Sequence, residues 1–309
     1  MTQSRTALFS RKQAGGLFTI VNLEETPNDV FFVCSVTGSD ATGYGYNPDS
    51  PVATIDYAVG LCTASKGDVI YVLPGHAENL ASATACALDV AGIRVIGVGH
   101  GGIIPTLTAT AAAGCVAITA ESVVVKNIKV VAGFATGCTN GITVSADADY
   151  CELDHIVTRD TTTDKEWLIH ISVATTVTDL TIKNCDIVGL AGGSCTNAIL
   201  YAGTSSNVRI FDNIIDVDSS ASAIEHSAGK PTSILAKDNT ILNQDTDATD
   251  QYCIELKSDG TGLVVGNMGS YANAGAACYV GSAAFFVENY GGNTAGSSGE
   301  LDPAAVAIP

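Results

Sequence analysis

Short apolar strands recur along this chain at a nearly constant interval, and each one ends in a polar residue. The segments are VVVKN, ELDH, LTIKN, RIFDN, LAKDN, VVGN and FVEN, and their last residues are 28, 29, 29, 26, 28 and 22 positions apart. Six of these seven last residues are asparagine, and the exception is His155. No helical period separates the strands, so the repeat predicts a solenoid of short stacked strands.

A second apolar column lies upstream of each of these strands. It reads VAIT, GITV, IHIS, AILY, AIEH, CIEL and CYVG, with turn-like stretches such as SADAD and KSDGTG between the two columns. A unit of this size is too short to bury its own apolar face. Neighbouring units must therefore stack, with each residue on its equivalent in the next unit. We therefore predict an all-β fold, a single-stranded parallel β-helix with coils of about 28 residues.

The asparagine column has two structural interpretations. A buried side-chain amide both donates and accepts, so stacked asparagines can form a hydrogen-bonded ladder from coil to coil. The predicted ladder contains Asn127, Asn184, Asn213, Asn239, Asn267 and Asn289. The alternative is a set of turn residues in the left-handed conformation, which asparagine tolerates. Neither interpretation gives these residues a catalytic role.

The pattern divides the chain into four regions. We predict a flexible basic arm over 1–16, a cap over 17–66 with a short helix near 51–63, β-helix coils over 67–290 and a Gly/Ser-rich tail over 291–309. A covering helix is expected because the open end of a stack exposes its core and its strand edges. Ser50 is suited to the N-cap and Pro51 to the first helical position. Apolar residues then repeat at helical spacing, namely Val52, Ile55, Val59 and Cys62.

The run TGSDATGYGYNPDSPVATIDYAVGLCTASKGDVIYVLPGHAEN resembles the opening of pectin-lyase-like right-handed parallel β-helix proteins. The matching positions are Gly38 and Asp40 of a Gly-x-Asp turn, Thr54, Ile55 and Ala58 of a T-I-x-x-A helix, and Gly67, Asp68, Ile70, Val72, Pro74 and Gly75 of G-D-x-I-x-V-x-P-G. The resemblance implies a right-handed solenoid. It implies little about activity, because the superfamily contains lyases, hydrolases, esterases, and phage tailspikes and other virion proteins.

Composition narrows the possible partners. The net charge of −18 repels nucleic-acid phosphates, so nucleic-acid binding is not expected. No signal-like apolar run follows the N-terminal basic residues, and no segment approaches the roughly 18 apolar residues of a membrane span, so we expect a chain made in a cytoplasm with no membrane contact. The ten cysteines show no metal-ligand spacing and are expected to be reduced and buried. No metal or cofactor motif is found.

One pair of carboxylates has a spacing that suits catalysis. Glu225 and Glu255 occupy the same position in adjacent coils, each directly after an inward isoleucine, so we expect them to face outward about 5 Å apart. That separation suits the two carboxylates of a retaining glycosidase. The competing interpretation is an acidic spot with no role. The motifs expected of pectate-lyase-like, polygalacturonase-like and esterase-like members are not found.

The N-terminal arm differs in charge from the body of the chain. It has no acidic residue in its first 16 positions and offers basic and apolar side chains for docking, namely Arg5, Leu8, Phe9, Arg11 and Lys12. We predict that this arm attaches the solenoid to a partner or to sister subunits, through contacts that salt would weaken.

These observations favour a non-enzymatic structural protein of a bacteriophage virion, a capsid decoration or a fibre or spike component assembled in the host cytoplasm. The expected partners are other virion proteins or sister subunits, and the resemblance to phage members implies a homotrimer. The alternative is a polysaccharide-binding or polysaccharide-degrading β-helix, a depolymerase of lyase or glycosidase type. A bacterial surface adhesin module is a third possibility.

Overall fold

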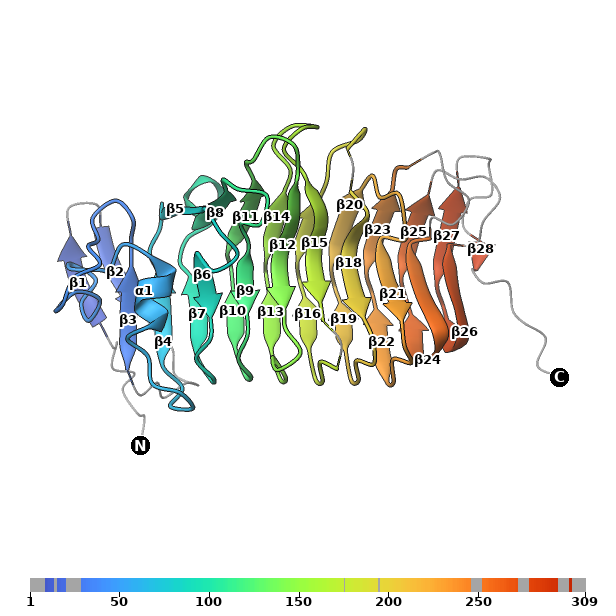
Figure 1. The fold of residues 1–309 in the computed structure, drawn as a ribbon, viewed down its shortest axis with the longest axis horizontal. Helices are drawn as coiled ribbons and strands as arrows, with labels where there is room; N and C mark the ends of the chain where they lie inside the picture. The colour runs from blue at the N-terminus through green and yellow to red at the C-terminus, as the bar shows by residue number, and fades with distance from the viewer. Residues whose placement is uncertain are drawn as a thin grey trace.

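The protein is a right-handed parallel β-solenoid with almost no helix, which confirms the predicted fold class. The structure is a computed structural model that describes residues 9–13, 16–20, 29–174, 176–193, 195–245, 252–271, 278–293 and 300–301. Its coils stack along the long axis of the molecule, from the N-terminal cap to the last strands (Figure 1).

Three parallel faces surround the core, and the chain visits them in turn. The first face contains β3 (Val30–Val33), β4 (Val69–Val72), β7 (Arg94–Gly97), β10 (Val124–Lys126), β13 (Glu152–Asp154), β16 (Thr181–Lys183), β19 (Arg209–Phe211) and β22 (Ile234–Lys237). The second contains β5 (Ala77–Leu80), β8 (Thr106–Ala109), β11 (Lys129–Ala132), β14 (Val157–Arg159), β17 (Asp186–Val188), β20 (Ile214–Val217), β23 (Thr240–Asn243), β25 (Met268–Tyr271) and β27 (Tyr290–Asn293). The third contains β6 (Cys86–Leu88), β9 (Val116–Ile118), β12 (Cys138–Val144), β15 (Trp167–Val173), β18 (Asn197–Ala202) and β21 (Ile224–Ala228).

Two long strands join the third face to the first at the C-terminal end. β24 (Ile254–Val265) pairs with β21 through its first residues and with β22 through its last residues. β26 (Tyr279–Val287) follows β24 through the same corner. The two faces therefore form one sheet here, whereas turns separate them in the earlier coils.

The core is a set of apolar columns that run through the stack. On the first face, Leu153 is paired with Val125 on one side and Ile182 on the other, and all three side chains are buried. On the third face, the predicted inward column is in register from Ile142 onward through Ile171, Ile199, Ile224, Ile254 and Tyr279. Ile118 does not belong to it, because Val116 is the partner of Ile142 and Ile118 pairs with Val144.

The cap helix is shorter and begins later than predicted. Helix α1 is Ile55–Val59, and its N-cap is Thr54, whose Oγ1 accepts the N–H of Tyr57 at 3.2 Å. Pro51 and Val52 lie in extended chain, because the N–H of Val52 donates to the carbonyl of Phe32 in β3. The predicted start at Ser50 and Pro51 is therefore wrong. The helix still closes the end of the stack, packing against β3, β4 and β6.

Strands also occur where the sequence pattern indicated flexible ends. β1 (Phe9–Gln13) pairs antiparallel with β2 (Gly16–Ile20), so this part of the predicted flexible arm is a hairpin. At the other end, β27 continues the second face to Asn293, and β28 (Glu300–Leu301) returns antiparallel beside it. The last coil therefore extends beyond the predicted boundary at residue 290. A short 3₁₀ helix, η1 (Gly101–Ile103), lies in a turn.

Candidate functional site

A ladder of buried asparagines joins the last four coils. Asn213, Asn239, Asn267 and Asn289 are almost completely buried. The Nδ2 of Asn213 donates to Oδ1 of Asn239 at 2.9 Å, and the same contact recurs from Asn239 to Asn267 at 2.9 Å and from Asn267 to Asn289 at 2.8 Å. Each Oδ1 also accepts a backbone N–H from the preceding coil, that of Cys185 in the case of Asn213. These asparagines therefore hold adjacent coils in register.

The ladder does not include the two earlier asparagines, which corrects the predicted six-residue column. Asn127 and Asn184 have φ values of 55° and 53°, so they are left-handed turn residues one position before the ladder position. The equivalent turn residue in the coil of Asn213 is Asp212, with φ of 57°. Both interpretations of the sequence thus apply, each to a different part of the stack. The ladder position itself is occupied in the earlier coils by Ile128, Ile156 and Cys185.

The carboxylates of Glu225 and Glu255 belong to neighbouring strands, as the repeat predicts. The two residues are register partners in β21 and β24. Each follows a fully buried isoleucine in its strand, but the two glutamates are themselves only 6 % and 8 % exposed, so the pair is shielded from solvent. Glu225 Oε2 accepts from Asn197 Nδ2 at 2.7 Å, and Glu255 Oε2 accepts from Ser222 Oγ at 2.6 Å. Glu225 thereby binds the start of β18, and Glu255 binds the turn that leads into β21.

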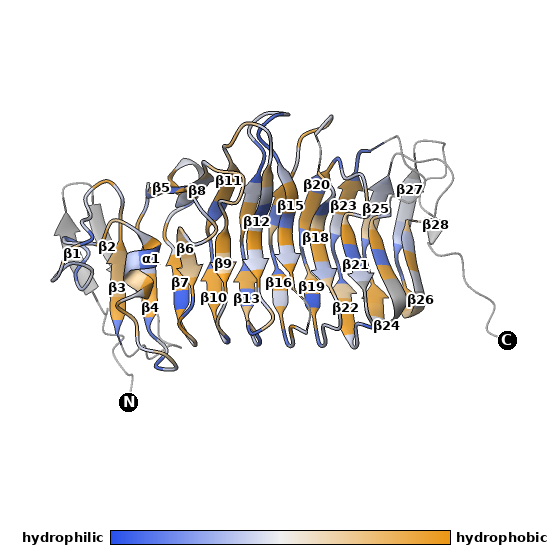
Figure 2. Ribbon diagram, in the orientation of Figure 1, coloured by the Kyte–Doolittle hydropathy of each residue, from blue (hydrophilic) through white to orange (hydrophobic). Residues whose placement is uncertain are grey.

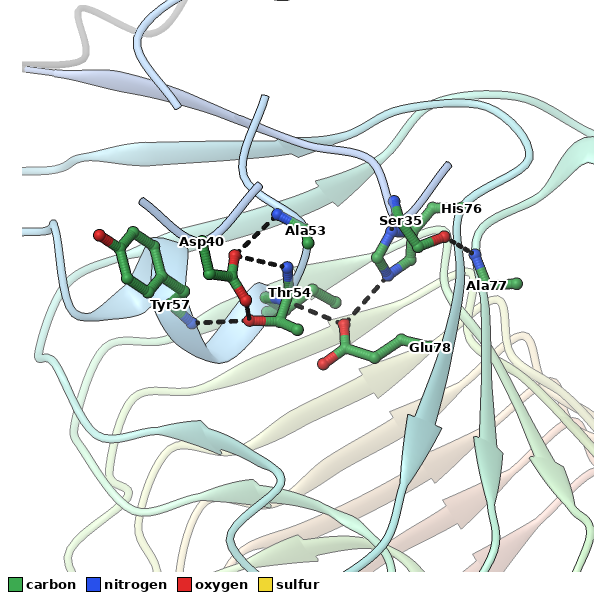
Figure 3. Close-up of polar contacts among 9 residues, drawn as sticks. Ser35, Asp40, Ala53, Thr54, Tyr57, His76, Ala77 and Glu78 are labelled. Atoms are coloured by element: carbon green, nitrogen blue, oxygen red, sulfur yellow. Dashed lines mark hydrogen bonds and ion pairs between the residues drawn. The ribbon is translucent and has the colours of Figure 1, made fainter. Parts of the chain in front are cut away.

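The motif that carries the family resemblance forms the polar framework of the cap. Asp40 accepts the backbone N–H groups of Ala53 and Thr54 through Oδ1, at 2.7 and 3.1 Å, and the Thr54 hydroxyl through Oδ2 at 2.8 Å (Figure 3). Gly38 is required because an added Cβ would lie 2.2 Å from the carbonyl oxygen of Val52. The motif therefore specifies how the first coil is closed.

Next to this framework lies a buried histidine with a carboxylate partner. His76 Nδ1 accepts the backbone N–H of Ser35 at 3.0 Å, so the ring proton is on Nε2, which is 3.0 Å from Glu78 Oε2 (Figure 3). Glu78 Oε2 also accepts the N–H of Ile55, the first residue of α1. The Ser35 hydroxyl accepts the N–H of Ala77 rather than contacting the imidazole in this network. The arrangement anchors the helix and is not a nucleophile with its base.

Ion pairs occupy the outer surface of the first face. Asp154 pairs with Lys126 of the preceding strand at 2.7 Å and with its neighbour His155 at 2.5 Å. Burial raises the pKa of Asp154, but hydrogen bonds from Lys126, Asn184 and His155 outweigh it, so the pKa lies below its usual value. On the second face, Arg159 pairs with Asp186. Such pairs between adjacent coils offset the stacking of like charges.

A corner between the second and third faces holds polar groups that sequence reasoning did not single out. Burial raises the pKa of Asp160 to about 6, although its oxygens accept the N–H groups of Trp167 and Leu190, and the charge of Glu166 adds to the rise. Glu166 Oε2 is buried and has no hydrogen-bond partner among the described residues. Burial, with a smaller effect of Arg159, lowers the pKa of His170 to about 3. The single signal in the sequence is the charged turn DTTTDKE.

Exposed apolar side chains gather on the last coils. Ile214, Met268 and Tyr290 lie on the second face at one register position, and Leu263 and Phe285 are register partners on the first. In the earlier coils the equivalent first-face position alternates between charged and uncharged residues, namely Arg94, Val124, Glu152, Thr181 and Arg209. Figure 2 shows hydrophobic colouring on β22 and β24 where β7 and β19 carry hydrophilic bands. At this register position the charged residues therefore give way to apolar ones, Leu235, Leu263 and Phe285, in the last coils.

The predicted docking arm is only partly described. Phe9, Arg11 and Lys12 lie in β1, whereas Arg5 and Leu8 lie outside the described residues. Among the described residues, no group of three or more His, Cys, Asp and Glu side chains is placed to hold a metal ion. In that same part of the chain, no helix has the length and hydrophobicity needed to cross a membrane. All ten cysteines are free thiols, and nine are buried.

Comparison with known proteins supports the fold class. The sequence matches no protein-family model, and no curated protein matches it. Among solved structures, a rhamnogalacturonan lyase shares 15 % identity over 85 % of this chain and 74 % of that one, with a TM-score of 0.53. A pectin methylesterase from Aspergillus niger shares 12 % identity over 92 % of this chain and 93 % of that one, with a TM-score of 0.50. These neighbours are pectin-lyase-like β-helix proteins, and the likeness is one of fold.

A phage protein also resembles the chain, more weakly. The ORF18 protein of Geobacillus virus E2 shares 11 % identity over 92 % of this chain and 67 % of that one, with a TM-score of 0.37. At that score the likeness carries no argument about function. The fold is a right-handed parallel β-helix, and the solved structures that it resembles include pectin-lyase-like β-helix proteins.

Proposed function

We propose that the protein is a non-enzymatic structural component of a bacteriophage particle, a capsid decoration or a fibre or spike element. The observation that supports this most is the burial and hydrogen bonding of Glu225 and Glu255. These carboxylates form the pair whose spacing suited catalysis, and both are buried and hydrogen-bonded to turns of the solenoid itself. A catalytic acid must reach its substrate, so this pair serves the scaffold.

The apolar surface of the last coils supports an assembly role. Contiguous exposed apolar side chains on a soluble protein mark contact surfaces. Met268 and Tyr290 are adjacent and exposed on the second face, Ile214 is exposed two coils before Met268, and Leu263 and Phe285 are adjacent and exposed on the first face. On this proposal the partners are other virion proteins or sister subunits, and residues 1–16 contribute a second attachment through Arg11, Lys12 and their neighbours.

The experiment for this proposal is detection of the chain in particles. Phage particles purified from a lysate that produces the chain are probed with an antibody against it and examined by immunogold electron microscopy. The proposal predicts gold at one repeated position on the particle. Particles without label, together with all of the chain in the particle-free supernatant, contradict it.

A second candidate function is action on an acidic polysaccharide. The observation that favours it is the half-buried carboxyl group of Asp160, whose pKa is raised to about 6 by burial. Solved structures of similar fold include a rhamnogalacturonan lyase and pectin methylesterases. Purified protein is incubated with pectins and bacterial acidic polysaccharides, and products are measured. Cleavage that Asp160→Asn abolishes would support this function over the structural one.

A further inference from the structure

Three turns lie side by side at the corner between the second and third faces. They connect β14 to β15, β17 to β18 and β20 to β21. Asp160 begins the first turn, and its Oδ2 accepts the N–H of Leu190 in the second turn at 3.0 Å. Asp218 begins the third turn, and its Oδ2 accepts the N–H of Gly192 in the second. Carboxylates from both neighbouring coils thus hold the middle turn, which begins with the run GLAGG at 189–193.

A third carboxylate, that of Glu166, points at the same middle turn from within the corner. Glu166 is 4 % exposed, and its Oε2 is buried without a hydrogen-bond partner in the described part of the chain. This oxygen lies 2.4 Å from the position that a Cβ atom of Gly193 would occupy, and the carbonyl oxygen of Leu190 lies 3.0 Å from that position. Because Gly193 has no side chain, two oxygen atoms from different coils approach the same point.

The negative charge of this corner has no basic partner among the described residues. None of their ion pairs includes Asp160, Glu166 or Asp218. Burial raises the pKa of the Cys195 thiol, and the charges of these same three carboxylates raise it further, so all three lie close to one buried side chain. A carboxylate that is buried without a cation or a hydrogen-bond donor is strongly disfavoured in its ionised form. A bound cation would remove that penalty for Glu166.

We propose that this corner binds a calcium ion, with Glu166 Oε2 and the carbonyl oxygen of Leu190 as its ligands from the chain. Ca²⁺ prefers oxygen ligands, accepts backbone carbonyls and water beside carboxylates, and tolerates irregular geometry, whereas Mg²⁺ demands a near-octahedral set at shorter distances. Within the described chain no three His, Cys, Asp or Glu side chains are placed to hold one metal ion. Asp160 and Asp218 therefore contribute their charge, and water completes the coordination.

The ion would join two coils at their longest turns. Glu166 belongs to the turn before β15 and Leu190 to the turn before β18, so one cation bridges adjacent coils beside the hydrogen bonds of Asp160. Binding to the folded chain alone raises its stability. The pKa of about 6 at Asp160 applies to the ion-free chain, because a nearby cation favours the ionised form. The site is independent of the proposed virion function and would be present in the purified protein.

The test uses Trp167, the only tryptophan of the chain, as a reporter. It directly follows Glu166, and its backbone N–H donates to Asp160 Oδ1 at 2.9 Å. Terbium occupies calcium sites and emits when a tryptophan beside it is excited. The full chain is stripped with EDTA and titrated with TbCl₃ under excitation of tryptophan alone, and CaCl₂ is then added as competitor. We expect saturable emission that CaCl₂ displaces, and a higher Tm in CaCl₂ than in EDTA.

Two substitutions at the site and one control complete the test. Glu166→Gln keeps the shape of the side chain but removes its charge, and Gly193→Ala adds a Cβ atom against Glu166 Oε2, so each should weaken terbium binding by about tenfold or more. Asp147→Asn removes a charge at an exposed turn elsewhere and should bind as wild type does.

Three results would overturn the inference. One is wild-type emission that does not saturate or that CaCl₂ does not displace. Another is unchanged binding in either site variant while circular dichroism shows that variant folded. The third is an equal loss of binding in the Asp147→Asn control, which would indicate diffuse attraction to an acidic surface. None of these results would alter immunogold labelling of particles, so failure of the calcium site and failure of the virion proposal are distinguishable.

Discussion

The side chain of Asn239 donates from Nδ2 to Oδ1 of Asn267 at 2.9 Å, and that oxygen also accepts the backbone N–H of Asn239 at 3.0 Å. The side-chain amide of Asn267 thus accepts hydrogen bonds from both the side chain and the backbone of Asn239 in the preceding coil. Because Asn239 is buried, no water replaces these bonds when one partner is lost. The strength of the C-terminal coils therefore depends on polar contacts inside the stack.

Replacing this residue should weaken the whole stack. Asn239→Ala removes two donated bonds and one accepting oxygen, which leaves the buried backbone N–H of Asn213 without its acceptor. We expect a loss of about 2–4 kcal/mol in the free energy of unfolding, measured by urea denaturation. Asn79→Ala, at an exposed position of β5, is the control and should change stability by less than about 0.5 kcal/mol. Equal effects of the two substitutions would contradict the ladder.

The order of Gly and Ala variants distinguishes turn asparagines from ladder asparagines. Asn127→Gly and Asn127→Ala lose the same side-chain bonds, but Asn127 has φ of 55°, a conformation that glycine adopts without strain. We expect the glycine variant to be more stable by about 1 kcal/mol in thermal or urea unfolding. Asn239 is not at positive φ, so there the alanine variant should be the more stable one. The same order at both positions would refute the assignment of the two classes.

The buried carboxyl group of Asp160 should leave a signature in the pH dependence of stability. Burial raises its pKa to about 6, against about 3.9 in the unfolded chain, so the folded state binds a proton more tightly. Its contribution to stability is complete below about pH 4 and is lost as the pH rises through 6, by at most about 3 kcal/mol.

The measurement is urea unfolding of wild type and Asp160→Asn between pH 4.5 and 7.5. The stability of wild type relative to the variant should fall as the pH rises. Asp147→Asn, at an exposed turn position, is the matched control and should run parallel to wild type. A difference between wild type and Asp160→Asn that is constant, or that grows with pH, would show that the carboxyl group is not held in this way.

The cysteines should be unreactive in the native protein. Burial raises the pKa of Cys62 to about 12, that of Cys151 to about 11 and that of Cys185 to about 12, so the reactive thiolate is scarce at pH 8. We expect negligible reaction with Ellman's reagent in buffer and ten thiols after denaturation without reductant. Recovery of markedly fewer than ten thiols would indicate disulfides and contradict the structure.

The repeat predicted the fold because stacking depends on the pattern as a whole. A shift of one residue in the alignment of the coils does not change that pattern. The same tolerance hid the division of the asparagine column, since a turn residue such as Asn184 and a ladder residue such as Asn213 are one position apart in an alignment. The burial of Glu225 was not predictable, because Asn197, whose amide binds it, lies a full coil away in sequence. The unusual pKa of Asp160 likewise depends on burial by the turn of another coil.

The central claim is that the buried polar side chains hold a stack together rather than act on a substrate, and Glu225 tests it most directly. The measurement is the free energy of unfolding of Glu225→Ala relative to wild type, with polysaccharide cleavage assayed on the same samples. Because Glu225 Oε2 accepts the Asn197 amide at 2.7 Å, the account predicts a loss of about 1–3 kcal/mol and no cleavage by either protein. Unchanged stability, with cleavage by wild type that the variant lacks, would contradict it.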